Sequence, residues 1–160
     1  MKIKIGIGYD IHRLVTGRKL ILGGVAVDFH KGLLGHSDAD VLIHALADAL
    51  LGALGLPNIG QLFPNTETWT QDLDSKKILK YARGMISRMG YKISNMDIVI
   101  IAQEPNLSPY LYKIRESIAS ILLVDGEDIG LKATTHEGFG ATGSGEAIAS
   151  FASTILISDR

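Results

Sequence analysis

The chain has no cysteine among its 160 residues, and this constrains how it can fold. Neither a disulfide framework nor a cysteine-rich zinc module can form, so the fold must depend on a buried apolar core. Hydrophobic residues make up 46% of the sequence, and a chain of this length can bury such a core, which predicts one domain over residues 1–160. Any transition-metal site must use histidine and carboxylate ligands, so the five histidines become the candidates.

Charge and hydropathy exclude other classes of protein. With 16 basic and 17 acidic residues, the chain has no excess of positive charge for a nucleic-acid backbone, although a compact anion site is compatible with this balance. The longest apolar stretch, 41–56, is too short and too polar to span a membrane, and the N-terminus lacks a signal-peptide core. We therefore expect no nucleic-acid or membrane partner and a cytoplasmic location, or a plastid-type organelle if a targeting segment was removed.

Strand and helix patterns alternate along the chain, which predicts a sandwich of the α+β or α/β class with a sheet on one side and helices on the other. The Gly- and Pro-rich stretch 55–74 is typical of a long functional loop. The tail 146–157 combines alanines with β-forming residues, so periodicity alone leaves it between helix and strand. The expected elements are strands at 3–9 and 20–27, a helix at 38–52 capped by Ser37, a helix at 75–89 opened by Asp74-Ser75, a strand within 93–103, a helix at 109–123 capped by Ser108, and a strand at 129–135.

Three residues could hold a metal ion. Asp10 and His12 are two apart in an extended segment just past the first predicted strand, so their side chains point to the same side. His44 lies on the first helix, with Asp40 one turn earlier, where a carboxylate can hold a neighbouring side chain. A catalytic zinc takes three protein ligands and keeps a fourth position open, a count that this set satisfies. From spacing alone, a packed and hydrogen-bonded histidine remains the commoner explanation for His44.

Two further polar clusters could hold phosphate. His36 and Ser37 precede the first helix, whose N-terminal N–H groups could cradle an anion, but plain helix capping explains that pattern more simply. Thr134, Thr135 and Glu137 end a predicted strand, where hydroxyls could bind phosphate and the carboxylate Mg²⁺; a strand edge followed by a turn is the plainer explanation. The glycine run that follows has no lysine in the P-loop position.

Six segments, taken in order over nearly the whole chain, resemble the 2-C-methyl-D-erythritol 2,4-cyclodiphosphate synthase family. Each segment alone is short, but their collinear order makes chance agreement implausible. They are Gly8–His12, Lys31–Val41, His44–Ala53, Ile59–Pro64, Ile101–Pro105 and Lys132–Thr135.

The resemblance implies a lyase of the non-mevalonate isoprenoid pathway. Such an enzyme converts 4-diphosphocytidyl-2-C-methyl-D-erythritol 2-phosphate into the cyclic diphosphate and releases CMP. The implied fold class is α+β, with a four-stranded, mainly mixed sheet and helices on one face. The sheets of three subunits would face a common axis in a homotrimer with active sites between subunits, and the tail 146–157 would be a strand of that sheet.

The resemblance also implies roles for individual residues. The zinc ligands, for one ion per subunit, would be Asp10, His12 and His44, and Glu137 would bind Mg²⁺ or Mn²⁺. The catalytic residues would be His36 and Thr135. Substrate-binding residues would be Ser37, Asn58, Ile59, Gly60, Phe63, Pro64, Asn65, Thr66, Glu67, Ala102, Gln103, Glu104, Pro105, Asn106, Leu107, Ser108, Thr134, His136, Ala141 and Ser144, with 102–108 forming the cytidine loop.

The sequence departs from the family pattern at several of these positions. Asn58 and Asn65 stand where the family has Asp, and Asn keeps an acceptor but loses the charge, so we expect altered substrate anchoring without loss of function. Asn106 replaces a common Lys. Ala141 and Ser144 replace an aromatic residue and an Arg that the family associates with an isoprenoid phosphate on the trimer axis, so such a ligand is not expected here.

Two alternatives stay beside the synthase. One is a trimeric relative that keeps the metal site but acts only as a binding protein. The other is a zinc-dependent nucleotide phosphohydrolase, which would use the same metals to activate water and would release a linear product.

Overall fold

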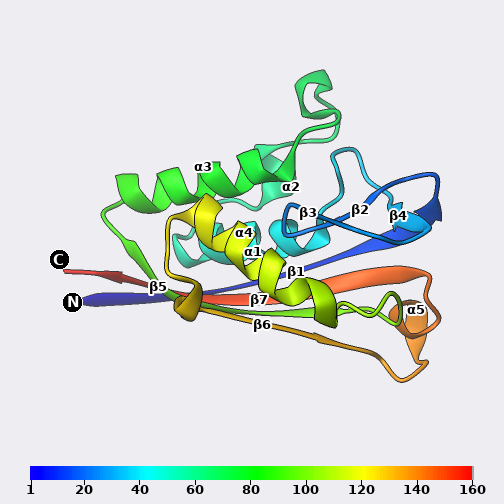
Figure 1. Ribbon diagram of the computed structural model, residues 1–160. Coiled ribbons are helices and arrows are strands. Elements are labelled where there is room, and N and C mark those ends of the chain that lie inside the picture. Colours follow the sequence, from blue (N-terminus) through cyan, green and yellow to red (C-terminus); the bar gives the residue numbers. More distant parts are fainter. Residues whose placement is uncertain (160) are drawn as a thin grey trace.

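The structure is a β-sheet covered on one face by helices, and the computed structural model describes residues 1–159 (Figure 1). The strands are β1 (Lys2–Thr16), β2 (Leu20–Leu22), β3 (Val25–Val27), β4 (Lys31–Leu33), β5 (Lys92–Ile101), β6 (Ile129–Thr134) and β7 (Ala147–Ser158). The helices are α1 (Val41–Ala53), α2 (Ile59–Leu62), α3 (Ser75–Arg88), α4 (Leu111–Leu122) and α5 (Gly140–Gly143), with 3₁₀ turns η1 (Thr68–Thr70), η2 (Ser108–Tyr110) and η3 (Gly126–Asp128).

The main sheet of the described chain is mixed and has five strands, in the order β4-β1-β7-β5-β6. β7 lies in the middle and pairs antiparallel with β1 and β5, whereas β6 runs parallel to β5. The α+β class is confirmed, and the tail is the strand that the resemblance implied. The expected count of four strands was wrong, because β4 adds a fifth at the edge of β1 and three residues are too few to show alternation.

The first helix, α1, is the centre of the core. It packs against β1, β7 and α3, and almost all of its residues are buried, with only Asp48 and Gly52 reaching the surface. A helix that is apolar on all sides is typical of this position. His44 lies on this helix, and the residue is only 8% exposed.

Two glycines allow α1 to lie directly on β1. Gly6 and Gly8 face the helix layer, on the same side of the strand as Asp10 and His12. A Cβ atom on Gly6 would collide with the carbonyl oxygen of Ala49, and one on Gly8 would collide with that of Ala45. The backbone of the helix therefore touches the backbone of the strand, a close approach that only glycine permits.

Three expectations for local structure need correction. Residues 20–27 form a β2-β3 hairpin rather than one strand, because Gly23 and Gly24 turn the chain with positive φ. The N-cap of α1 is Asp40 and not Ser37, so the helix begins at Val41. Ser108 starts the 3₁₀ turn η2 instead of capping α4 directly. The cap of α3 by Asp74 is confirmed, since its carboxylate accepts a hydrogen bond from the Lys76 amide.

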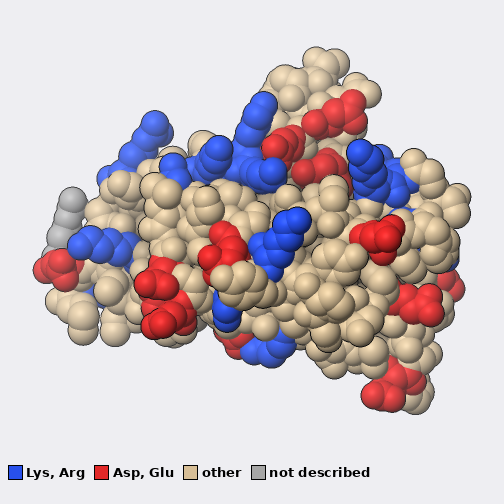
Figure 2. Space-filling model, viewed as in Figure 1, with Lys and Arg blue, Asp and Glu red and all other residues tan. Residues whose placement is uncertain are grey.

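The stretch 55–74, expected to be one long loop, contains two short elements, α2 and η1. On the face drawn in Figure 2, Lys and Arg side chains lie among Asp and Glu side chains, with several basic groups gathered over α3. None of the helices in the described residues 1–159 is long and apolar enough to cross a membrane.

The buried carboxylate of Asp40 ties the hairpin to the start of α1. It accepts hydrogen bonds from the amides of Gly23 (3.0 Å), Gly24 (2.7 Å) and Ile43 (3.1 Å). Burial raises the pKa of Asp40 to about 6, although the three amide donors act in the opposite direction. The folded protein therefore binds a proton here more tightly than the unfolded chain does.

The raised pKa predicts a pH dependence of stability. Because the unfolded carboxyl titrates near 3.8, the contribution of Asp40 to the free energy of unfolding should fall as the pH rises from about 4 to about 6, by up to about 3 kcal/mol. Asp40→Asn has no carboxyl group, so its stability relative to the wild type should improve over that window. Urea denaturation of both proteins across this range tests the prediction. Parallel stability curves for the two proteins would contradict it.

Candidate active site

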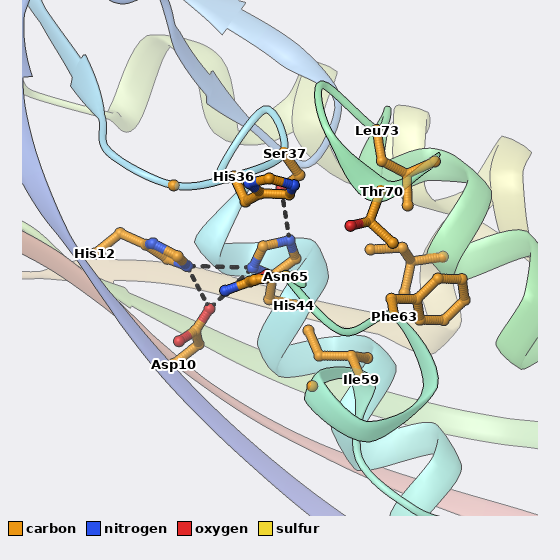
Figure 3. A pocket seen from close by; sticks show the side chains of 13 residues that line it. Asp10, His12, His36, Ser37, His44, Ile59, Phe63, Asn65, Thr70 and Leu73 are labelled. Atoms are coloured by element: carbon orange, nitrogen blue, oxygen red, sulfur yellow. Dashed lines mark hydrogen bonds and ion pairs between the residues drawn. The ribbon is translucent and has the colours of Figure 1, made fainter. Parts of the chain in front are cut away.

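Asp10, His12 and His44 meet at the junction of β1 and α1 (Figure 3). The Asp10 Oδ2 atom lies 2.8 Å from His12 Nε2 and 3.0 Å from His44 Nδ1, and the two nitrogens are 3.2 Å apart. The three ligand atoms all lie within 4.8 Å of one another. The convergence of a carboxylate oxygen and two imidazole nitrogens fits a catalytic zinc site with an open fourth position.

The outer nitrogen of each imidazole also has a partner. His12 Nδ1 lies 2.9 Å from the Leu34 carbonyl oxygen, so this nitrogen carries the proton and Nε2 is free to ligate. His44 Nε2 lies 3.0 Å from Ser75 Oγ and 3.4 Å from Ser37 Oγ. Asp40 does not hold the His44 ring, contrary to the i, i+4 expectation, because its carboxylate is occupied by the hairpin and cap amides.

The electrostatics of the cluster favour an ionised aspartate. Burial opposes ionisation of Asp10, but the two neighbouring imidazoles of His12 and His44 outweigh it and hold the pKa of the carboxyl well below its usual range. Burial also opposes protonation of His12, yet the hydrogen bond and charge of Asp10 raise the pKa of its imidazole above the usual value. A metal ion would take the place of a proton held between these groups, so metal binding should release a proton.

A cavity of about 200 Å³ opens above the cluster and collects many of the expected site residues. His36 and Ser37 line it from the segment before α1, and Figure 3 shows both near the ring of His44. Among the described residues, His36 Nε2 is a buried side-chain nitrogen without a hydrogen-bond partner, which suits a donor reserved for a ligand. The other expected residues that line the cavity are Ile59, Gly60, Phe63 and Asn65.

The comparisons with known proteins agree with this geometry. The model of the YgbB family matches residues 3–157. A 2-C-methyl-D-erythritol 2,4-cyclodiphosphate synthase of Clostridium acetobutylicum is 52% identical over 155 residues, which cover 97% of this chain and all of the relative. The chain belongs to the YgbB family.

Solved structures with this fold include members named for the same activity. IspF of Plasmodium falciparum, in a complex with CDP, superposes with a TM-score of 0.88 at 39% identity and covers 99% of this chain and 97% of that one. The bifunctional IspDF from Campylobacter jejuni superposes with a TM-score of 0.93 at 39% identity; the match covers 97% of this chain and 42% of that chain.

A second cavity, of about 440 Å³, is distinct from the first and contains other expected site residues of this YgbB-family chain. It is lined by the expected cytidine loop, 102–108, together with Ala133, Thr134 and Thr135. Thr135 therefore does not share a cavity with His36 within one chain, although the resemblance pairs them. Glu137 lines neither cavity and is exposed, as are all residues from 132 to 141.

Some expected substrate residues have other roles in the single chain. Asn58 caps α2 by accepting a hydrogen bond from the Gln61 amide. His136 Nδ1 lies 2.6 Å from Thr142 Oγ1, and this hydrogen bond connects the turn before α5 to the helix itself. The expected substrate residues that line neither cavity are Asn58, Pro64, Thr66, Glu67, His136, Ala141 and Ser144.

Sequence reasoning missed several residues that shape the site. Arg18 donates hydrogen bonds to the carbonyl oxygens of Gly35 (3.3 Å) and Ser37 (2.8 Å), and thereby clamps the segment that presents His36. Asp48 accepts a hydrogen bond from the Ile59 amide and ties α2 to α1. No motif marks these contacts, because each joins residues that are distant in the sequence. Ser75, Thr70, Leu73 and Ile78 were also missed.

Proposed function

We propose that this chain is a 2-C-methyl-D-erythritol 2,4-cyclodiphosphate synthase of non-mevalonate isoprenoid biosynthesis. The observation that carries the proposal is the Asp10, His12 and His44 cluster at the base of a cavity with a free His36 nitrogen, in a chain 52% identical to a relative of that name. The substrate would be 4-diphosphocytidyl-2-C-methyl-D-erythritol 2-phosphate, and the whole chain would act as one domain. Its relatives include bacterial enzymes, and we place the reaction in the cytoplasm.

The reaction is an intramolecular displacement at phosphorus. An oxygen of the 2-phosphate attacks the β-phosphorus and forms a new P–O bond, while the bond from that phosphorus to the oxygen bridging the α-phosphate breaks. CMP leaves with the electron pair of that bond, so atoms and charges balance without water. The phosphate is its own nucleophile, so the protein needs no general base and contributes by positioning and charge stabilisation.

The side chains of the first cavity are suited to that task. His36 Nε2 can donate a hydrogen bond to the diphosphate, and the Ser37 hydroxyl lies beside it. Ile59, Gly60 and Asn65 would hold the methylerythritol, with the Asn65 amide replacing the carboxylate of the family pattern. The cytidine loop and the hydroxyls of Thr134 and Thr135 would bind the nucleotide in the second cavity.

The donor set fits a resident zinc ion, which Asp10, His12 and His44 would hold. Both outer ring nitrogens are already occupied, and the cavity leaves room for a fourth ligand. Zinc would supply a Lewis acid and template for the diphosphate, and Mg²⁺ or Mn²⁺ bound through Glu137 and the substrate phosphates would neutralise charge on the leaving CMP.

The proposal includes a homotrimer with active sites between subunits, and two observations support it. The residues of the reaction are divided between two cavities of one chain, an arrangement that a neighbouring copy would complete by supplying the second part. In addition, the sheet face opposite the helices carries an exposed apolar stripe, including Ile5 (70% exposed) and Ile7 (65%). A stripe of this kind is typical of an interface. Its residues are Ile3, Ile5, Ile7, Tyr9, Ile11 and Phe151.

Phosphorus NMR tests the activity. With the cytidine diphosphate substrate, Zn²⁺ and Mg²⁺, we expect a cyclic diphosphate and an equal amount of CMP. His36→Ala should lose about 100-fold or more in turnover, because a donor to the developing charge is removed. His30→Ala, which changes a histidine outside both cavities, is the matched control and should keep full activity. A linear monophosphate product would indicate the hydrolase, and no turnover by the zinc-loaded protein would indicate a binding relative.

A charge in the apolar stripe tests the trimer. Ile5→Glu should give monomers in analytical ultracentrifugation, because three carboxylates would be brought together near the axis. The monomer should still bind zinc, whose three ligands lie in one chain, but should lose turnover because the second cavity of a neighbour is absent. Tyr112→Glu changes an equally exposed residue of the helix layer and should stay trimeric. An active Ile5→Glu monomer would rule out shared active sites.

A further inference from the structure

Ser75, the first residue of α3, contacts the cluster of Asp10, His12 and His44 through the His44 ring. Ser75 is fully buried, and its Oγ atom lies 3.0 Å from His44 Nε2, the nitrogen that faces away from the cluster. The same hydroxyl contacts the carboxylate of Asp38, and the Ser75 amide donates to the other carboxylate oxygen at 3.0 Å. Asp38, Ser75 and His44 therefore form a continuous chain of hydrogen bonds from the segment before α1 to the cluster.

The direction of these hydrogen bonds follows from their chemistry. A carboxylate only accepts, so the single hydroxyl proton of Ser75 is donated to Asp38. The lone pairs of Ser75 Oγ then face His44, and the His44 ring must donate from Nε2. In a neutral imidazole this leaves the lone pair on Nδ1, which lies 3.2 Å from His12 Nε2 and can accept a hydrogen bond from it. The chain of bonds thus selects the tautomer that can ligate a metal inside the cluster.

Helix capping does not account for Ser75. The N-cap of α3 is Asp74, whose carboxylate accepts the Lys76 amide at 2.9 Å, so the Ser75 hydroxyl is free of that role. Ser37 offers a second oxygen to His44 Nε2, but at 3.4 Å, and it already accepts from the Ala39 amide. Ser75 is therefore the principal partner of the outer nitrogen.

We propose that Ser75, oriented by Asp38, is a positioning residue that fixes the His44 tautomer and ring orientation for metal binding. The proposal rests on the metal centre of the proposed function and adds to it two residues that line neither cavity and are not among the three candidate ligands. Outer partners of this kind typically change metal affinity by about 10- to 100-fold when removed.

Competition with a zinc chelator measures the effect. Ser75→Ala should weaken zinc binding by about 10- to 100-fold, because the His44 ring loses the acceptor that holds its Nε2 proton. Thr154→Val is the matched control: it also removes a buried hydroxyl, one that donates to the Asn95 carbonyl on the main sheet, and it should leave zinc affinity unchanged. Zinc affinity within twofold of the wild type in folded Ser75→Ala would overturn the proposal.

The tautomer can be read without any variant. In the zinc-free wild-type protein, ¹⁵N NMR of the imidazoles at about pH 8, where most histidines are neutral, should show the proton of His44 on Nε2. In Ser75→Ala the signals should move toward a mixture of tautomers. A neutral wild-type His44 ring that carries its single proton on Nδ1 would contradict the proposal even if Ser75→Ala did not fold. Neither readout depends on turnover, so a chain that binds zinc in this way but forms no cyclic diphosphate would refute only the proposed function.

Discussion

The direct contact between the backbones of α1 and β1 is the constraint on which the site depends. Gly6 and Gly8 have no Cβ atoms, so the helix settles onto the strand at the carbonyls of Ala49 and Ala45. Asp10 and His12 continue the same face of the strand, and His44 projects from the same helix. A larger residue at either glycine would push the helix away and separate His44 from its two partners.

This packing also explains how the fold brings the three candidate metal ligands together. His44 is buried in the core helix, and its ring is held between Asp10 on one side and Ser75 on the other. Such a site loses little conformational freedom when it binds a metal, because the protein has ordered the ligands during folding. Most of the proposed substrate residues, in contrast, lie in the segments 58–67 and 102–108 and in the exposed segment 132–141, which we propose a neighbouring subunit completes.

The sequence predicted the local parts of this structure better than the long-range ones. The strand spacing of Asp10 and His12 placed both on one face, and the cap at Asp74 located the start of α3. Spacing alone left His44 undecided between a packed residue and a ligand, because its partners are 32 to 34 positions away. Strand β4 and the role of Ser75 were missed, since both arise from pairing between distant segments.

Anomalous diffraction at the zinc edge, from crystals grown with zinc, tests the account most directly. We predict one peak per subunit at about 2.0–2.2 Å from Asp10 Oδ2, His12 Nε2 and His44 Nδ1. A peak bound through His44 Nε2, or the absence of any peak at the junction of β1 and α1 in zinc-saturated crystals, would contradict it.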